Sequence, residues 1–149
     1  MVNLIITLIS IALIAAVAVA ALYNGGDAFR QGSAKSSAAQ LVNAGQQISA
    51  ANMLYANDHA GTYASSLNQL TTDGEYLSSA PRIPEGFTIN PAISSNVISI
   101  QNASGSDEIC KAVNKQAGYS EDILSEDTDV TRGFGCYGTS GTIATFVFK

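Results

Sequence analysis

Residues 4–22 read LIITLISIALIAAVAVAAL, an almost unbroken apolar run near the start of the 149-residue chain. No charged side chain occurs before Asp27. A helix of about 20 apolar residues is long enough to cross the hydrocarbon core of a bilayer. The rest of the chain is polar and glycine-rich, and it is large enough for one small domain. The sequence therefore predicts an apolar N-terminal helix attached to a water-facing domain.

Three roles are open to this first helix. A secretory signal peptide fits the small-x-small triplet at residues 18–20 (AVA), but no basic residue precedes the apolar run. An ordinary membrane anchor normally carries Lys or Arg beside its cytoplasmic end, whereas the first basic residues, Arg30 and Lys35, lie on the other side. We favour the third role, in which Met1 is a processed N-terminus whose basic leader has been removed.

A narrow apolar stripe predicts that helical structure continues to about Asp58. No proline interrupts residues 28–58. The stripe recurs at spacings of three, four and seven residues and consists of Ala34, Ala38, Leu41, Val42, Gly45, Ile48 and Tyr55. The opposite, polar face holds Ser36, Asn43, Gln46, Gln47 and Asn57.

Two adjacent glycines, Gly25 and Gly26, separate the apolar and amphipathic stretches. Each costs about 1 kcal/mol in a helix interior relative to alanine. The pair is therefore either the place where the helix kinks, stretches or unwinds, or a simple linker between an anchor and a domain.

The polar remainder predicts a small antiparallel sheet with short helices. We expect a short helix within residues 63–70, turns at residues 73–74 and 102–105, and strands at residues 87–89, 97–100 and 142–148. Residues 106–116 have helical signals, including acidic residues in the first turn and Gly118 just past the end, with Ile109 and Val113 facing the core. The predicted fold class is α+β, with an apolar helix (1–26), an amphipathic helix (27–59) and a globular head (60–149).

Composition limits the partners of this chain. Seven Lys and Arg residues and a net charge of −5 make direct nucleic-acid binding unlikely, because such binding depends on neutralising phosphates. The two cysteines, Cys110 and Cys136, follow a membrane-like segment, which suggests an oxidising location and one disulfide between the late helix and the loop before the last strand. Two free buried thiols are the alternative.

No enzyme signature, metal site or cofactor motif is evident in the sequence. The chain has one histidine, His59, near the expected end of the long helix, and no base lies beside any candidate nucleophile. The glycine-rich segment 133–138 lacks the lysine of a phosphate loop. Five acidic residues between 121 and 129 do not have EF-hand spacing, so a solvated acidic loop is favoured over a calcium site.

Taken together, these features resemble the type IV pilin family. The resemblance rests on the start MVNLI, the uncharged apolar helix, its amphipathic continuation, the small sheet domain and the two late cysteines. The segment 63–77, with its Leu-x-x-Leu pattern and DGEYL, is also similar to pilins. The late helix with the first cysteine and the GCYG at residues 135–138 favour the type IVb branch, which includes pilins of conjugative plasmids.

The resemblance implies a pilin fold, in which the long helix packs on the antiparallel sheet and a Cys110–Cys136 disulfide closes a C-terminal variable region. One position departs from the family, which usually carries a glutamate at the fifth mature position, paired with the amino terminus of a neighbouring subunit. Here that position is Ile5. The Met1 amine then has no acidic partner in an apolar environment, which is costly, so Asn3, Thr7 or a polar boundary must solvate it.

The implied function is that of a structural subunit which waits in the inner membrane and polymerises, with the pilus assembly machinery, into an extracellular helical filament. Such a fimbrium would serve cell adhesion, conjugation or motility, with N-terminal methylation and a surface receptor or recipient cell as further expectations. Gly25 and Gly26 would let the helix extend on assembly. The expected assembly residues are Met1, Asn3, Leu4, Ile5, Leu8, Ile11, Ala12, Ala15 and Ala16. The alternatives are a minor pilin or pseudopilin, or a monomeric membrane-anchored domain that binds something outside the cell.

Overall fold

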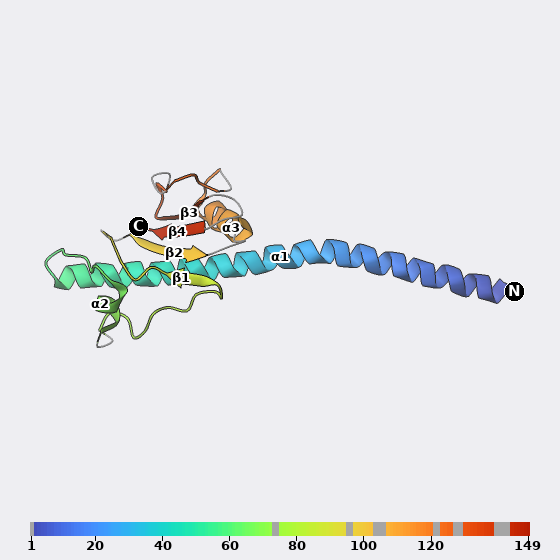
Figure 1. The fold of residues 1–149 in the computed structure, drawn as a ribbon, viewed down its shortest axis with the longest axis horizontal. Helices are drawn as coiled ribbons and strands as arrows, with labels where there is room; N and C mark the ends of the chain where they lie inside the picture. Colours follow the sequence, from blue (N-terminus) through green and yellow to red (C-terminus); the bar gives the residue numbers. More distant parts are fainter. Residues whose placement is uncertain are drawn as a thin grey trace. The chain divides into compact units, whose positions relative to one another are not determined.

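The computed structural model describes residues 2–72, 75–94, 97–102, 107–120, 123–126, 130–138 and 144–149. The chain divides into two compact units, residues 1–33 and 34–149. Helix α1 (Val2–Asp58) contributes to both units, and the second unit adds two short helices and one sheet (Figure 1). The predicted α+β class, with a long N-terminal helix and a small antiparallel sheet, is confirmed.

Helix α1 runs through the two adjacent glycines without a break. Both Gly25 and Gly26 are helical, so this segment is not unwound in the single chain, and its use as a linker or as a point of extension stays a prediction. The helix ends where Ala60 and Gly61 adopt positive φ angles of 53° and 86°. In this turn the Gly61 N–H donates to the Ala56 carbonyl oxygen at 2.7 Å, which satisfies a carbonyl of the last helical turn.

The apolar stripe of α1 forms one side of the core of the second unit, as its spacing predicts. Leu41 and Ile48 are fully buried, and the ring of Phe148 lies so close to Gly45 that a Cβ there would overlap it. All five residues predicted for the polar face are exposed. The stripe therefore decides which side of the helix the sheet covers.

Four antiparallel strands form the sheet in the order β1-β2-β4-β3. Their bounds are β1 (Phe87–Ile89), β2 (Ile98–Asn102), β3 (Phe134–Gly138) and β4 (Ala144–Phe148). The central strands pair Ile100 with Phe146, and on the other side of β4 Phe146 is paired with Cys136. Every residue of β4 is buried, so this strand is the centre of the core.

The two short helices fall close to their predicted positions. Helix α2 (Leu67–Thr71) buries Leu70, and helix α3 (Asp107–Ala117) buries Val113 with Ile109 partly buried against the same core. Gly118 follows α3 with a φ of 83°, a conformation that favours glycine at a helix end. The turn predicted at residues 73–74 lies outside the described residues, and so does the turn predicted at 102–105 except for Asn102, which ends β2.

Strand β3 was not predicted, because its sequence FGCYG has glycines at two of five positions. Gly135 has a structural reason: a Cβ there would lie 3.1 Å from Val130 Cγ1 and 3.2 Å from Tyr119 Cε2, closer than side chains normally approach. Cys136 therefore lies in an edge strand, and the prediction that it lies in a loop is wrong.

Candidate functional site

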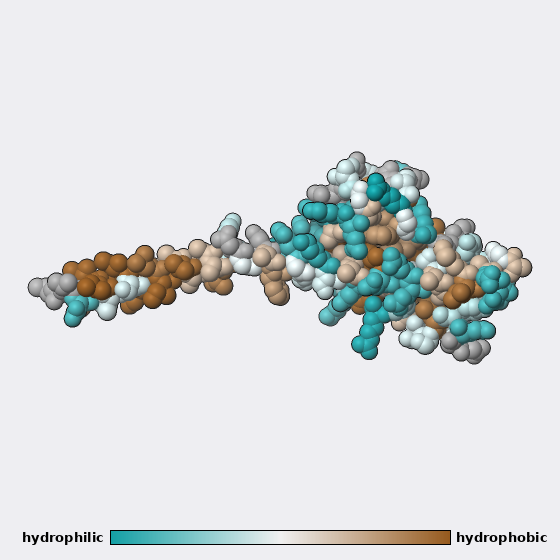
Figure 2. All heavy atoms as spheres, turned by 180° about the vertical axis from the view of Figure 1, so that it is seen from behind, coloured by the Kyte–Doolittle hydropathy of each residue, from teal (hydrophilic) through white to brown (hydrophobic). Residues whose placement is uncertain are grey.

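The first unit exposes a continuous apolar surface. Its large side chains are more than half exposed, including Leu4 at 67% and Leu22 at 77% (Figure 2). By length and composition the helix is able to cross a membrane. Apolar surface of this extent is unfavourable in water.

The residues predicted to direct assembly lie on this helix. Asn3, Leu4, Ile5, Leu8, Ile11, Ala12, Ala15 and Ala16 are all exposed. Spacings of three and four residues place Leu4, Leu8, Ile11, Ala12 and Ala15 along one side of the helix, whereas Asn3 lies off that side. Met1 lies outside the described residues.

The hydroxyl groups within the apolar run are satisfied by their own helix. Thr7 Oγ1 lies 2.9 Å from the carbonyl oxygens of Asn3 and Leu4, and Ser10 Oγ donates to the Ile6 carbonyl oxygen at 2.9 Å. Such bonds to the preceding turn leave no unmet hydrogen bond for lipid or a neighbouring helix to satisfy. Thr7 thus uses its hydroxyl proton within its own helix, while its oxygen can still accept a hydrogen bond, so solvation of the Met1 amine by Thr7 stays a prediction.

The surface of the first unit is not smooth. A shallow apolar groove of about 380 Å³ is lined by Leu13, Ile14, Val17, Ala18 and Ala21. Small side chains beside large ones allow a second helix to approach closely, since its side chains can enter such a depression.

Gly25 and Gly26 have no steric role within a single molecule. A Cβ at either position would meet no atom within 4 Å, and the same is true of Gly32. An assembly role for the glycine pair stays a prediction.

A disulfide joins Cys110 in α3 to Cys136 in β3, with a Cα–Cα distance of 5.4 Å. Both cysteines are fully buried, and the alternative of two free thiols is wrong. Asn114, one turn after Cys110, reinforces this connection. Its Nδ2 donates to the Cys136 carbonyl oxygen at 2.9 Å, and its Oδ1 accepts from the Cys136 N–H at 2.7 Å.

Sequence reasoning missed the role of Asn114. The available signal was its position four residues after Cys110, on the face of α3 that must turn toward the core. A polar side chain at such a position has to find partners, and the backbone of an edge strand supplies both a donor and an acceptor.

The outer edge of β3 is further covered by Leu124. The Leu124 N–H donates to the Cys136 carbonyl oxygen at 3.3 Å, and the Gly138 N–H donates to the Leu124 carbonyl oxygen at 3.0 Å. The Cys136 N–H and carbonyl and the Gly138 N–H on this edge are therefore occupied, which limits its pairing with other strands.

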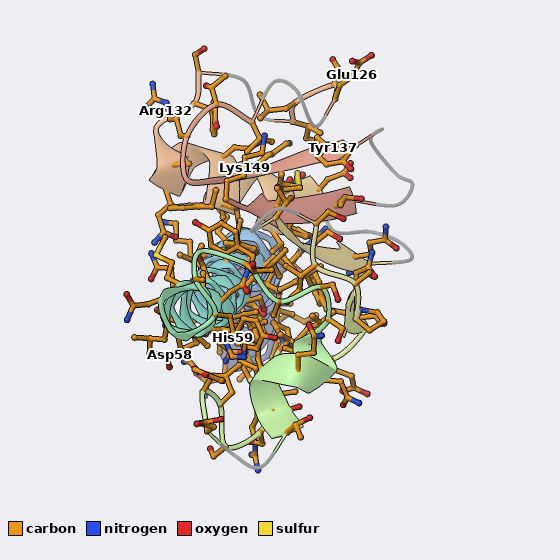
Figure 3. All side chains as sticks on the ribbon, turned by 90° about the vertical axis from the view of Figure 1, so that its left-hand side faces the viewer. Asp58, His59, Glu126, Arg132, Tyr137 and Lys149 are labelled. Carbon is orange, nitrogen blue, oxygen red and sulfur yellow. A yellow bond between two sulfur atoms is a disulfide. The ribbon has the colours of Figure 1, made fainter. Side chains whose placement is uncertain are left out.

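Aromatic side chains gather at the end of α1, where Figure 3 labels Asp58 and His59. The rings of Tyr55 and His59 stack with centroids 3.9 Å apart, and Tyr76 meets Tyr55 edge-on at 5.4 Å. The Tyr76 hydroxyl donates to Asp58 Oδ2 at 3.1 Å. Partial burial, and then this hydrogen bond to the Asp58 carboxylate, raise the pKa of Tyr76 above its ordinary value of 10.0.

His59 has a local structural environment. Its Nδ1 lies 2.9 Å from the Tyr55 carbonyl oxygen, one turn earlier in the chain. Among the described residues no group of three or more His, Cys, Asp and Glu could hold a metal ion. Of the predicted acidic loop, Glu126 is described and exposed, whereas residues 121–122, 127 and 129 lie outside the described part of the chain.

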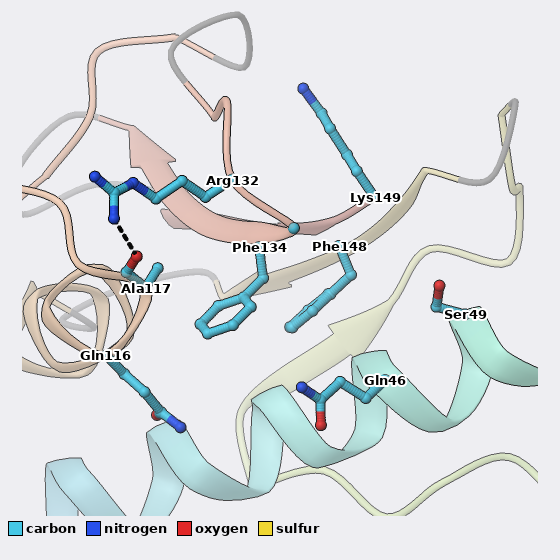
Figure 4. Close-up of a pocket in the computed structure, with 9 residues that line it drawn as sticks. Gln46, Ser49, Gln116, Ala117, Arg132, Phe134, Phe148 and Lys149 are labelled. Atoms are coloured by element: carbon cyan, nitrogen blue, oxygen red, sulfur yellow. Dashed lines mark hydrogen bonds between the residues drawn. The ribbon is translucent and has the colours of Figure 1, made fainter.

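The second unit contains a pocket of about 460 Å³. Figure 4 shows Phe134 and Phe148 pointing from the strands toward α1, with Gln46 and Gln116 on the helix side of the rings. The lining residues are Gln46, Ser49, Gln116, Ala117, Arg132, Gly133, Phe134, Phe148 and Lys149. This pocket could not be predicted from the sequence, because its walls come from four separate segments.

Comparison of the chain with protein-family models, with curated proteins and with solved structures found no match.

Proposed function

We propose that this chain is a structural subunit of a type IV-like pilus, which polymerises through its N-terminal helix. The observation that supports this most is the exposed apolar surface of the first unit, carried on the same helix that forms the core of a disulfide-bonded head. In this proposal the helix rests in the inner membrane before assembly. Helices of many copies then replace the lipid with one another, and an extracellular filament results.

The contacts between subunits follow from the shape of the apolar helix. Ala12, Ala15 and Ala16 lie on one side and permit close approach of backbones, while the groove beside Leu13 and Val17 can receive large side chains. A head-to-tail contact of this kind does not close on itself, so repetition produces a helical polymer. Position 5, where the pilin family usually carries a glutamate, is Ile5, and Asn3 is a polar residue close to it in sequence.

The second candidate is a monomeric, membrane-anchored domain that binds a ligand outside the cell, and a minor pilin or pseudopilin lies between the two. The pocket in the second unit favours a binding domain. The two candidates differ in one respect, because only the filament requires the small residues of the apolar helix to contact another copy.

The test is expression of the full chain in a host that supplies the pilus assembly machinery, followed by negative-stain imaging of material sheared from the cell surface. Ala16→Leu keeps the helix apolar but adds bulk on its small-residue side. We expect filaments from the unaltered chain, none from Ala16→Leu, and normal amounts of this variant in the membrane fraction.

The matched control is Ile6→Leu, which exchanges two side chains of equal volume at an exposed position outside the groove and the small-residue side, and it should form filaments. If the unaltered chain stays in the membrane as dispersed single molecules while the machinery assembles a known pilin, the filament proposal is overturned and the anchored binding domain is supported.

A further inference from the structure

We propose that the pocket between α1, the end of α3 and the strands β3 and β4 binds a carboxylated saccharide. This binding site goes beyond the proposed filament function and does not depend on it. The cavity of about 460 Å³ lies in the size range of small-molecule sites, and all of its lining residues belong to the second unit.

The charge of the pocket selects an anion. The whole chain carries a net charge of −5, yet the charged residues that line this pocket are Arg132 and Lys149, both cationic. Lys149 Nζ donates to the Val130 carbonyl oxygen at 2.9 Å and points away from the rings in Figure 4, so Arg132 is the cation available to a ligand. No Asp or Glu is among the nine lining residues. A local reversal of sign in an acidic protein concentrates anions at that place.

Arg132 is held in position to receive a carboxylate. Its Nη1 donates to the Ala117 carbonyl oxygen at 3.1 Å, and its guanidinium carbon lies 5.3 Å from the centre of the Tyr119 ring. Its backbone N–H donates to the Tyr119 hydroxyl at 2.8 Å. A guanidinium group has five N–H donors in a planar fork, and the bond to Ala117 uses one of them.

The uncharged part of the lining matches a sugar ring. Gln46 and Gln116 are exposed amides, and each has donors and an acceptor, as does the hydroxyl of Ser49. Sugar hydroxyls need partners of both kinds. The partly buried ring of Phe134 supplies an apolar wall against which the C–H face of a sugar can lie.

An acidic peptide fits this place less well. Extended peptides commonly bind by adding a strand to a free sheet edge. Here the Lys149 N–H already donates to the Gly133 carbonyl oxygen at 2.9 Å, and Asn114 occupies both backbone groups of Cys136 on the outer edge of β3. The pocket offers side-chain groups rather than backbone groups, which favours a saccharide.

Isothermal titration calorimetry of the full-length protein in detergent tests this inference on single molecules, so the result is separate from polymerisation. The probes are a trimer of galacturonic acid and its methyl ester, which has the same rings without charge. We expect saturable binding of the acid, and binding of the ester weaker by about tenfold or more, as expected for the loss of a charge-assisted hydrogen bond.

Two matched pairs of variants locate the site. Gln46→Glu places a carboxylate in the pocket and should weaken binding of the acid by about tenfold, whereas Gln47→Glu adds the same charge at a neighbouring exposed position outside the lining and should bind normally. Arg132→Gln should weaken binding similarly, with the exposed Arg82→Gln as its control.

Thermal unfolding of each variant establishes that it is folded. Three results would overturn the inference. These are equal binding of the acid and the ester, equal effects of Gln46→Glu and Gln47→Glu, and no binding of either probe at millimolar concentration. Binding of a tetraglutamate peptide more tightly than the trisaccharide would assign the pocket to acidic peptides and would also overturn it.

Discussion

In the described part of the second unit Asn52 and Asn114 are fully buried, and each bonds to backbone groups of another segment. Asn52 Oδ1 accepts from the Ala64 N–H at 2.8 Å, which holds the chain just after α1 against that helix. Asn114 exchanges two hydrogen bonds with the backbone of Cys136. In both cases an amide side chain replaces the neighbouring strand or turn that backbone groups normally find.

Replacement of Asn114 by alanine should destabilise the head. The buried Cys136 N–H would lose its acceptor, and an unsatisfied buried donor costs about 1–3 kcal/mol. Chemical denaturation of the full-length protein in detergent, with the disulfide intact, measures this as a lower free energy of unfolding. The exposed Asn43→Ala should change it by less than about 0.5 kcal/mol. Equal stability of the two variants would contradict the role given to Asn114.

Tyr76 should make the stability of the head fall in alkaline solution. Because its pKa is raised in the folded state, the unfolded chain loses the phenolic proton first. The contribution of Tyr76 is therefore complete below about pH 10 and is lost as the pH rises through the folded-state pKa. Thermal unfolding between about pH 9 and about pH 12 should show a shallower alkaline decline for Tyr76→Phe. Tyr63→Phe, at an exposed tyrosine, should retain the original decline.

At the scale of elements, the contact between α1 and β4 depends on a missing side chain. Gly45 lies in the apolar stripe of α1, where the ring of Phe148 occupies the space of a Cβ. Phe148 is almost fully buried and ends the central strand. Close approach of helix and sheet thus places a glycine in a helix interior despite its unfavourable helix propensity.

Gly45→Ala should therefore destabilise the head, although alanine is the better helix former. The exchange gains roughly 1 kcal/mol in helix propensity. Overpacking of a core costs about 1–3 kcal/mol, and this cost applies in full when the Phe148 ring cannot move aside. A buried ring such as that of Phe148 has little room to move, so we expect a lower unfolding temperature. Gly32→Ala is the control, since a Cβ at Gly32 meets no atom within 4 Å and should leave the unfolding temperature unchanged or raise it.

Within the proposed filament, Gly25 and Gly26 should matter for the packing of one subunit against another. A double change to alanine creates no clash inside one chain and strengthens the helix by about 1 kcal/mol per site. If the pair lets the helix extend on assembly, this variant forms fewer filaments or filaments with a different length per subunit, measured by electron microscopy. Gly32→Ala provides the same exchange seven and six residues further along. Normal filaments whose helix is continuous through residues 25–26 in the unaltered protein would refute the idea.

At the scale of the whole molecule, polarity follows the division into two units. Residues 1–33 hold the exposed apolar surface, whereas the buried core lies within residues 34–149. A substitution in the first unit should thus affect association without affecting the core of the second.

Ala16→Leu tests this separation. The change adds apolar bulk at an exposed position of the first unit. It should therefore change the free energy of unfolding of the head in detergent by less than about 0.5 kcal/mol. The same variant should fail to form filaments. Circular dichroism measures the unfolding, and a clear drop in its midpoint would show that the two units are energetically linked.

The sequence predicted those parts of the fold that repeat with a regular period. The stripe from Ala34 to Tyr55, the helix around Val113 and the strand ending at Phe148 all follow from the spacing and type of their side chains. The strand at residues 134–138 could not be predicted in this way, because its glycines are explained by Val130 and Tyr119, which are its neighbours only in the folded molecule.

The candidate sites show the same difference between local sequence patterns and contacts formed only on folding. The apolar assembly surface is a property of consecutive residues, so the sequence alone reveals it. The pairing of Asn114 with Cys136 and the pocket around Arg132 require residues that are distant in the chain to come together. Such sites are determined by the topology of the sheet, and no local sequence pattern predicts them.

The disulfide has a mechanical consequence. When the two ends of the chain are pulled apart, the force passes directly through the sulfur–sulfur bond, and the segment between Cys110 and Cys136 carries no tension. With a sequence separation of 26 residues, about 90 Å of contour length is withheld from extension. Strand β3 begins inside this shielded segment. A pulling force that unfolds other parts of the head therefore cannot extend the residues between the two cysteines.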